Sequence, residues 1–198
     1  PRAVTCLNRW VARARSVEFL TQMAHVAHKY TLVSMDEIKG LLSRAQSYAR
    51  MQDDQYLVAQ AWSRLGCGEE TTRAVDAYDG LSTDLDELLT SIELLRGVAP
   101  EPAADRCRQL VREAQDAFIL ACAIKECVGL ADDVLPTAVT PFLRMNGDCH
   151  DCLMVLDAVG AQLLAPVQKA LIEHAVRTAD DGYDAALIMT EAHRLKLH

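Results

Sequence analysis

Two short clusters in this sequence carry residue types that bind metal ions in proteins, and the first is the stretch DCHDC. Its Cys149 and Cys152 form a C-x-x-C pair that could supply two thiolates to zinc, with His150 between them. A structural zinc site needs four ligands, and no second C-x-x-C or H-x-x-x-H follows at zinc-finger spacing. His174 or Cys127 could complete a site only if the fold brought them close.

The same stretch is also typical of the start of a helix. Asp148 or Asp151 would then cap the helix, and Cys152 would enter the core. A thioredoxin-like redox role would need a β-α-β context, which the sequence lacks. Both interpretations, metal ligand and helix start, therefore remain open for Cys149, His150 and Cys152.

The second cluster is DDGYD, in which Asp180, Asp181 and Asp184 match the Asp-Asp-x-x-Asp pattern that holds magnesium for prenyl diphosphate chemistry. Carboxylates at i and i+4 on one helical face can hold Mg²⁺ against phosphates. Such enzymes need a second acidic cluster on a facing helix, and the stretch LADDVLP offers only Asp132 and Asp133. The alternative is that these carboxylates cap the last helix.

The histidines and the known catalytic motifs add no reaction. His25 and His28 lie at i and i+3, but a di-iron bundle would require two Glu-x-x-His motifs, which are absent. The sequence has no G-x-x-x-x-G-K-[ST], G-x-G-x-x-G or G-x-S-x-G. We expect no catalytic residue and no cofactor, and we interpret these histidines as surface or interface residues.

The elements that must position these residues are predicted to be helices. Apolar residues recur at helical spacing in SVEFLTQMAHVAHKY and in MDEIKGLLSRAQSYARM, and alternating strand patterns are absent. The sequence is rich in Ala and Leu and poor in aromatic residues. The predicted class is therefore all-α.

Joints between helices recur at regular intervals. Each joint is a glycine followed by a proline five to seven residues later, at Gly97 and Pro102, Gly129 and Pro136, and Gly160 and Pro166. We expect each glycine in the left-handed conformation just past a helix and each proline in the first turn of the next helix. Pro141 should kink or shorten its helix.

Successive glycines of these joints are 32 and 31 residues apart, which predicts one helix pair per repeat. Residues 36–66 look like an earlier, more degenerate pair, and residues 183–197 like a final capping helix. We therefore expect a basic N-terminal helical segment over 1–35 and a helical-repeat domain over 36–198. The predicted architecture is a short right-handed α-solenoid of stacked hairpins; the alternative is an irregular helical bundle.

Two stretches resemble degenerate copies of the pentatricopeptide and octotricopeptide class of helical repeats. They are DEIKGLLSRAQSYARMQDDQYLVAQAWSRLG and CLMVLDAVGAQLLAPVQKALIEHAV. The resemblance implies an organellar protein. Many members of that class bind single-stranded RNA, and others bind proteins, including a helical-repeat accessory subunit on the F1 sector of euglenozoan mitochondrial ATP synthase.

The charge distribution favours the protein-binding branch. Residues 1–50 carry a net charge of +5, residues 51–100 a net charge of −7 and residues 101–198 a net charge of −6. An acidic surface repels phosphate backbones, so nucleic-acid binding is not expected of the repeat region. The early arginines, with Glu18 as the first acidic residue, are similar in flavour to an organellar import region.

The cysteines and the apolar runs limit the location. The seven cysteines are scattered among apolar neighbours, so we expect free thiols in a reducing, intracellular compartment. No apolar run approaches the roughly 18 residues that cross a bilayer. Together with the resemblance, these features predict a mitochondrial protein.

The leading hypothesis is a non-catalytic subunit that docks on a larger protein assembly. The rivals are an organellar RNA-binding module and a metal-dependent helical enzyme that uses Asp180, Asp181 and Asp184. Aromatic and basic residues are the expected partner contacts, because such side chains dominate contact energies, although the aromatic ones could equally be core. These candidates are Trp10, Arg13, Tyr48, Tyr56 and Trp62.

Overall fold

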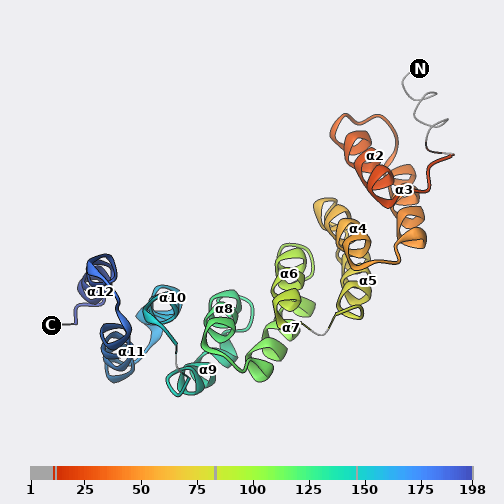
Figure 1. Ribbon diagram of the computed structural model, residues 1–198. Helices are drawn as coiled ribbons and strands as arrows, with labels where there is room; N and C mark the ends of the chain where they lie inside the picture. Colours follow the sequence, from red (N-terminus) through yellow and green to blue (C-terminus); the bar gives the residue numbers. More distant parts are fainter. Residues whose placement is uncertain (1–10, 12, 83, 146, 198) are drawn as a thin grey trace. The chain divides into compact units, whose positions relative to one another are not determined.

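The structure is a computed structural model that describes residues 11, 13–82, 84–145 and 147–197. Within these ranges it contains eleven α-helices, two short 3-10 helices and no strand (Figure 1). The α-helices pack in consecutive pairs, so the predicted all-α class is confirmed. The elements are α2 (Val17–Lys29), α3 (Met35–Tyr48), α4 (Gln52–Arg64), α5 (Gly68–Asp79), α6 (Leu85–Arg96), α7 (Pro100–Glu113), α8 (Ala117–Cys127), η1 (Asp132–Val134), α9 (Leu135–Phe142), α10 (Cys149–Val159), η2 (Gly160–Gln162), α11 (Ala165–Thr178) and α12 (Gly182–Arg194).

The chain divides into two compact units. The first comprises the described residues of Pro1–Glu87 and Glu93–Pro102, and the second comprises those of Leu88–Ile92 and Ala103–His198. The division passes through both α6 and α7. Each unit buries its own set of aliphatic side chains, for example Leu20, Leu42 and Val58 in the first and Ile124 and Leu156 in the second.

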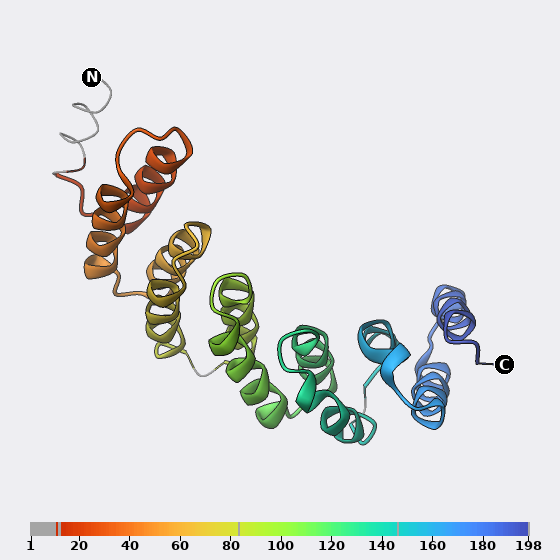
Figure 2. The same ribbon diagram turned by 180° about the vertical axis from the view of Figure 1, so that it is seen from behind.

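Within each unit the first helix of one pair lies against the first helix of the next. In the first unit α2 pairs with α3 and α4 with α5, and α2 also contacts α4. In the second unit α8 pairs with α9 and α10 with α11, and α10 contacts both α8 and α12. The pairs are visible from both sides (Figures 1 and 2). This is the packing of a helical repeat, in which each pair completes its core on a neighbour.

The period is more regular in the structure than in the glycine and proline pattern. The first helices begin at Val17, Gln52, Leu85, Ala117, Cys149 and Gly182, so successive starts are 32 to 35 residues apart. Helix α12, which covers the predicted capping segment, occupies the position of a further first helix and packs on α10 and α11. The right-handed superhelix expected for the whole chain stays a prediction.

The N-terminal pairing differs from the expected one. Residues 36–66 contain α3 and α4, but α3 packs mainly on α2, and α4 packs mainly on α5. Helix α5 lies just beyond the predicted pair and was not anticipated. Helix α2, from the segment 1–35, and α3, from the segment 36–198, therefore share one core.

The expected left-handed glycines are found at only one of the three joints. Gly129 has φ of +74° after α8, as predicted. Gly97 and Gly160 are wrong predictions, since both are right-handed, with φ of −86° and −52°. Gly160 instead continues α10 into η2, and a Cβ there would lie only 3.3 Å from Leu195. Helix α9 has eight residues and ends one residue after Pro141, so it is short as expected.

Candidate functional site

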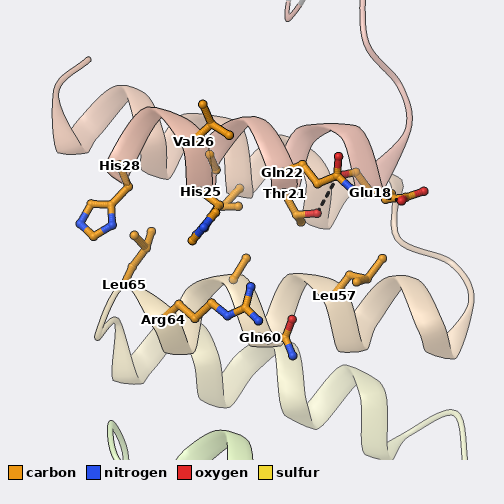
Figure 3. Close-up of a pocket in the computed structure, with 13 residues that line it drawn as sticks. Glu18, Thr21, Gln22, His25, Val26, His28, Leu57, Gln60, Arg64 and Leu65 are labelled. Carbon is orange, nitrogen blue, oxygen red and sulfur yellow. Dashed lines mark hydrogen bonds between the residues drawn. The ribbon is translucent and has the colours of Figure 1, made fainter. Parts of the chain in front are cut away.

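The largest hollow of the first unit is a groove between α2 and α4, with a volume of about 720 Å³. Helix α2 contributes residues between Glu18 and His28, α3 contributes Leu42, and the α4 region contributes residues between Leu57 and Leu65. Figure 3 shows Glu18 near the Leu57 end and His28 near the Leu65 end, so α2 and α4 run in the same direction along the groove. We refer to this feature as the α2/α4 groove.

The apolar floor of the α2/α4 groove arises because α4 has two apolar stripes. One stripe includes Val58 and Trp62, is buried, and belongs to the core of the first unit. The other consists of Leu57, Ala61 and Leu65, which recur every four residues, line the groove and stay partly exposed. A single helix has one buried face to spend on its own pair, so the second stripe offers apolar surface to something else.

Polar side chains stand on the rim of the groove and divide it into two ends. At one end Gln22 Nε2 donates a hydrogen bond of 3.1 Å to Glu18 Oε1. At the other end His25 and His28 point from α2 toward α4, and Arg64 lies on the opposite wall (Figure 3). All three basic side chains are exposed, and within the described part of the chain none has a hydrogen-bond or ion-pair partner.

The cysteine cluster lies at the start of α10. Asp148 is the N-cap and forms a capping box with Asp151, which confirms the helix-start interpretation of the stretch. Cys149 and Cys152 are buried, whereas the side chain of His150 is 62% exposed and points away from this core. The two thiols and the imidazole therefore do not converge on one point.

Burial also opposes ionisation of these thiols. It raises the pKa of Cys152 to about 12, and the neighbouring carboxylate of Asp151 adds to the effect. It raises the pKa of Cys149 as well, helped by the charges of Asp184 and Asp148. Zinc binding and nucleophilic attack both require a thiolate, so this environment disfavours both.

The aspartate cluster organises the start of α12. Asp181 is the N-cap and accepts hydrogen bonds from the backbone N–H groups of Tyr183 and Asp184. Asp184 is buried, and its Oδ2 accepts the backbone N–H of Asp180 at 3.0 Å. Its Oδ1 lies 3.4 Å from Nε2 of His150. The fold thus brings the two sequence clusters together through this one contact.

The juxtaposed clusters do not form a metal site in the described ranges. No group of three or more His, Cys, Asp or Glu side chains there is placed to hold an ion. Asp181 and Asp184 are engaged with backbone N–H groups. This capping role is what the alternative interpretation of the DDGYD stretch predicted.

The predicted partner contacts near the N-terminus lie around α3. Trp10 lies outside the described residues, and Arg13 is exposed. Tyr48 is partly buried, and Arg44 lies over its ring at 5.8 Å from the centroid. The Arg44 guanidinium also donates to the carbonyl oxygens of Val11 and Ala14, each at 2.6 Å, and so fixes the chain before α2 to α3.

The remaining aromatic candidates divide between core and surface. Trp62 is only 3% exposed and belongs to the core of the first unit, so it is no exposed anchor. Tyr56 is partly buried, packs 6.2 Å from the ring of Tyr78, and accepts a hydrogen bond from Gln60 Nε2. These two aromatic residues therefore serve mainly to join α4 to α5.

The groove residues were missed by motif-based reasoning, apart from the two histidines. The signal that could have found them is the second apolar stripe of α4 together with a period near 35 residues, which places α2 beside α4. Within the described ranges no helix is both long and apolar enough to cross a membrane. Comparison with protein-family models, with curated proteins and with solved structures gives no match.

Proposed function

We propose that the chain is a non-catalytic interaction subunit that holds a protein partner within a larger assembly. The observation that carries the proposal is the α2/α4 groove, whose partly exposed Leu57, Ala61 and Leu65 form an apolar surface that no other part of the described first unit covers. Stacked helix pairs present such grooves between neighbouring first helices, and amphipathic segments bind in them through their apolar faces.

Electrostatics support a protein partner over RNA. The first helices of the later pairs are acidic at their N-termini, for example through Asp86 and Glu87 in α6 and through Asp184 in α12. An RNA-binding repeat would need Lys and Arg along these helices to neutralise phosphates. The net charge of −13 that residues 51–198 carry works against that requirement.

The mitochondrial location belongs to the same proposal, as does a role beside ATP synthase. What supports them is the resemblance of residues 36–66 and 152–176 to organellar helical repeats and the basic character of residues 1–50. Fractionation of the source cells with the endogenous protein followed by immunoblotting tests the location. Recovery with organelle markers is expected, and recovery elsewhere would remove this part of the proposal.

The test of the proposed function is stoichiometric co-purification that depends on the groove. Tagged full-length protein is purified natively beside an Ala61→Trp variant, in which an indole fills the groove, and an Ala186→Trp control on the exposed face of α12. We expect one partner that co-elutes with the wild type and the control but not with Ala61→Trp. Circular dichroism confirms that both variants are folded.

The RNA rival is tested on the same protein. A fluorescein-labelled single-stranded RNA is titrated with wild-type protein at several salt concentrations. Binding that weakens steeply with salt, together with a partner list insensitive to Ala61→Trp, would replace the proposed function by the RNA-binding alternative.

A further inference from the structure

We propose that the α2/α4 groove binds an amphipathic α-helix that carries acidic residues in its first turn and runs antiparallel to α2 and α4. This inference deepens the proposed function by naming the chemistry and the direction of the partner segment. It rests on the length of the groove, its apolar floor and the distribution of charge along its rim.

The length of the groove fits a short helical segment. Its lining extends from Glu18 to His28 on α2 and from Leu57 to Leu65 beside it. At a rise of 1.5 Å per residue these spans are roughly 12–15 Å, which corresponds to about two to three turns of a partner helix. A groove along two parallel helices is the shape that an amphipathic helix occupies.

The floor sets the partner's apolar pattern. Ala24 of α2 and Ala61 of α4 have small side chains, so the backbone of a bound helix can approach closely between the two walls. Leu42, Leu57 and Leu65 supply the larger apolar contacts. The matching face on the partner is a set of Leu, Ile or Met residues at i, i+3, i+4 and i+7.

The rim sets the partner's charge. His25, His28 and Arg64 gather at the end of the groove where α2 and α4 finish, and they have no partner within the described residues. Glu18 stands at the opposite end and bonds only to Gln22 of its own helix among the described groups. Carboxylates of the bound segment are therefore attracted to the first end, and a basic residue is attracted to the second.

The helix dipole then fixes the direction. Acidic side chains stabilise the first turn of a helix and basic side chains the last turn, by about 0.3–1 kcal/mol each. A partner helix with acidic residues in its first turn meets His28 and Arg64 only if its N-terminus lies at their end of the groove. It then runs antiparallel to α2 and α4, and its positive N-terminal dipole faces their negative C-terminal ends.

The test uses defined peptide probes on the full chain. A fluorescein-labelled, capped helical peptide of about 14 residues carries Leu at i, i+3, i+4 and i+7 and Glu in its first turn. A second probe has Lys in place of Glu, and a third has Glu in its last turn instead. Fluorescence anisotropy gives the Kd of each probe for the wild type and for Ala61→Trp, Arg64→Glu and Arg144→Glu.

We expect the first probe to bind at least about tenfold more tightly than the other two. Arg64→Glu should remove this preference or reverse it, and Ala61→Trp should abolish binding. Arg144→Glu makes the same charge change at an exposed arginine that does not line the groove, and it should have no effect. Failure of all three probes to bind, or equal affinities that Arg64→Glu leaves unchanged, would overturn the inference.

The outcomes separate this inference from the proposed function. If Ala61→Trp releases the native partner but the probes show no charge preference, the interaction role stands and the acidic helix is wrong. If the acidic probe binds through Arg64 but no native partner depends on Ala61, the groove has the inferred specificity and the proposed function fails. Equal binding of the first and third probes removes the antiparallel direction.

Discussion

Nε2 of His150 in α10 lies 3.4 Å from Oδ1 of Asp184 in α12. This contact joins two clusters that are 30 residues or more apart in the sequence and that motif-based reasoning treated as separate metal candidates. The other oxygen of Asp184 accepts the backbone N–H of Asp180. Asp184 is therefore a structural residue that holds the start of α12 against α10.

We predict that Asp184→Ala lowers the free energy of unfolding by about 1–2 kcal/mol, because the backbone N–H of Asp180 loses its acceptor beside a buried position. Asp184→Asn keeps an acceptor oxygen and should cost less. Urea denaturation followed by circular dichroism measures both. His150→Ala removes an exposed partner and should change stability by less than about 0.5 kcal/mol; a larger loss there would show that the imidazole contributes more than the cap.

A second prediction concerns the carboxyl group of Asp151, which closes the capping box of α10. Burial raises its pKa, although its hydrogen bond from the backbone N–H of Asp148 acts in the opposite direction. The folded state therefore holds this proton more tightly than the unfolded state, so the free energy of unfolding should rise as pH falls from 7 toward the ordinary aspartate range. Asp151→Asn keeps the acceptor oxygen and removes the charge.

The comparison of these two proteins between pH 7 and pH 4 isolates the effect of Asp151. The wild type should gain stability relative to Asp151→Asn as the pH falls, and Asp151→Asn should be at least as stable as the wild type at pH 7. The opposite trend would mean that the hydrogen bond to Asp148 outweighs burial. Asp148→Asn, at the exposed N-cap, is the matched control.

The all-α class could be predicted from the sequence because each helix carries its own apolar stripe, but the pairing could not be read from glycine and proline alone. Helix α5 begins at Gly68 without a proline and was missed, although Thr71, Ala74, Val75 and Tyr78 mark its buried face at helical spacing. The left-handed glycine that resembles Gly129 is Gly66, with φ of +70°, and not Gly97 or Gly160. Left-handed turns depend on how the next helix packs, which local sequence does not specify.

The groove was not predictable from motifs for a related reason. Leu57, Ala61 and Arg64 become a wall only when α4 stacks beside α2, about 35 residues earlier in the sequence. A metal motif, in contrast, is local and attracts attention even when its residues cap a helix. The Cys149 and Asp181 clusters show this, because N-caps use the same Asp residues that bind metals.

A third prediction follows from the buried thiol of Cys152. Its pKa in the folded state is about 12, against a usual value of 9.0, so the folded state retains a proton that the unfolded state releases. The stabilising contribution is fully present below about pH 9 and is lost as pH rises toward 12, at about 1.4 kcal/mol per pH unit. Chemical denaturation at pH 7, 9 and 10.5 should show a shallower alkaline loss for Cys152→Ala than for the wild type. Identical slopes would mean that the thiol is accessible to solvent and ionises normally.

The last prediction uses two glycines with opposite environments in the first unit. A Cβ at Gly68, the first residue of α5, would overlap the backbone carbonyl oxygen of Val98, so Gly68→Ala should lower the free energy of unfolding by about 1–3 kcal/mol. Gly40 lies inside α3 with no atom within 4 Å of the same position, and Gly40→Ala should raise it by about 0.5–1 kcal/mol because alanine loses less backbone entropy in a helix. Thermal and urea denaturation of both variants gives the two signs. A neutral Gly68→Ala would mean that the carbonyl of Val98 does not lie against α5, and with it the close packing of the turn between α6 and α7 on that helix would be wrong.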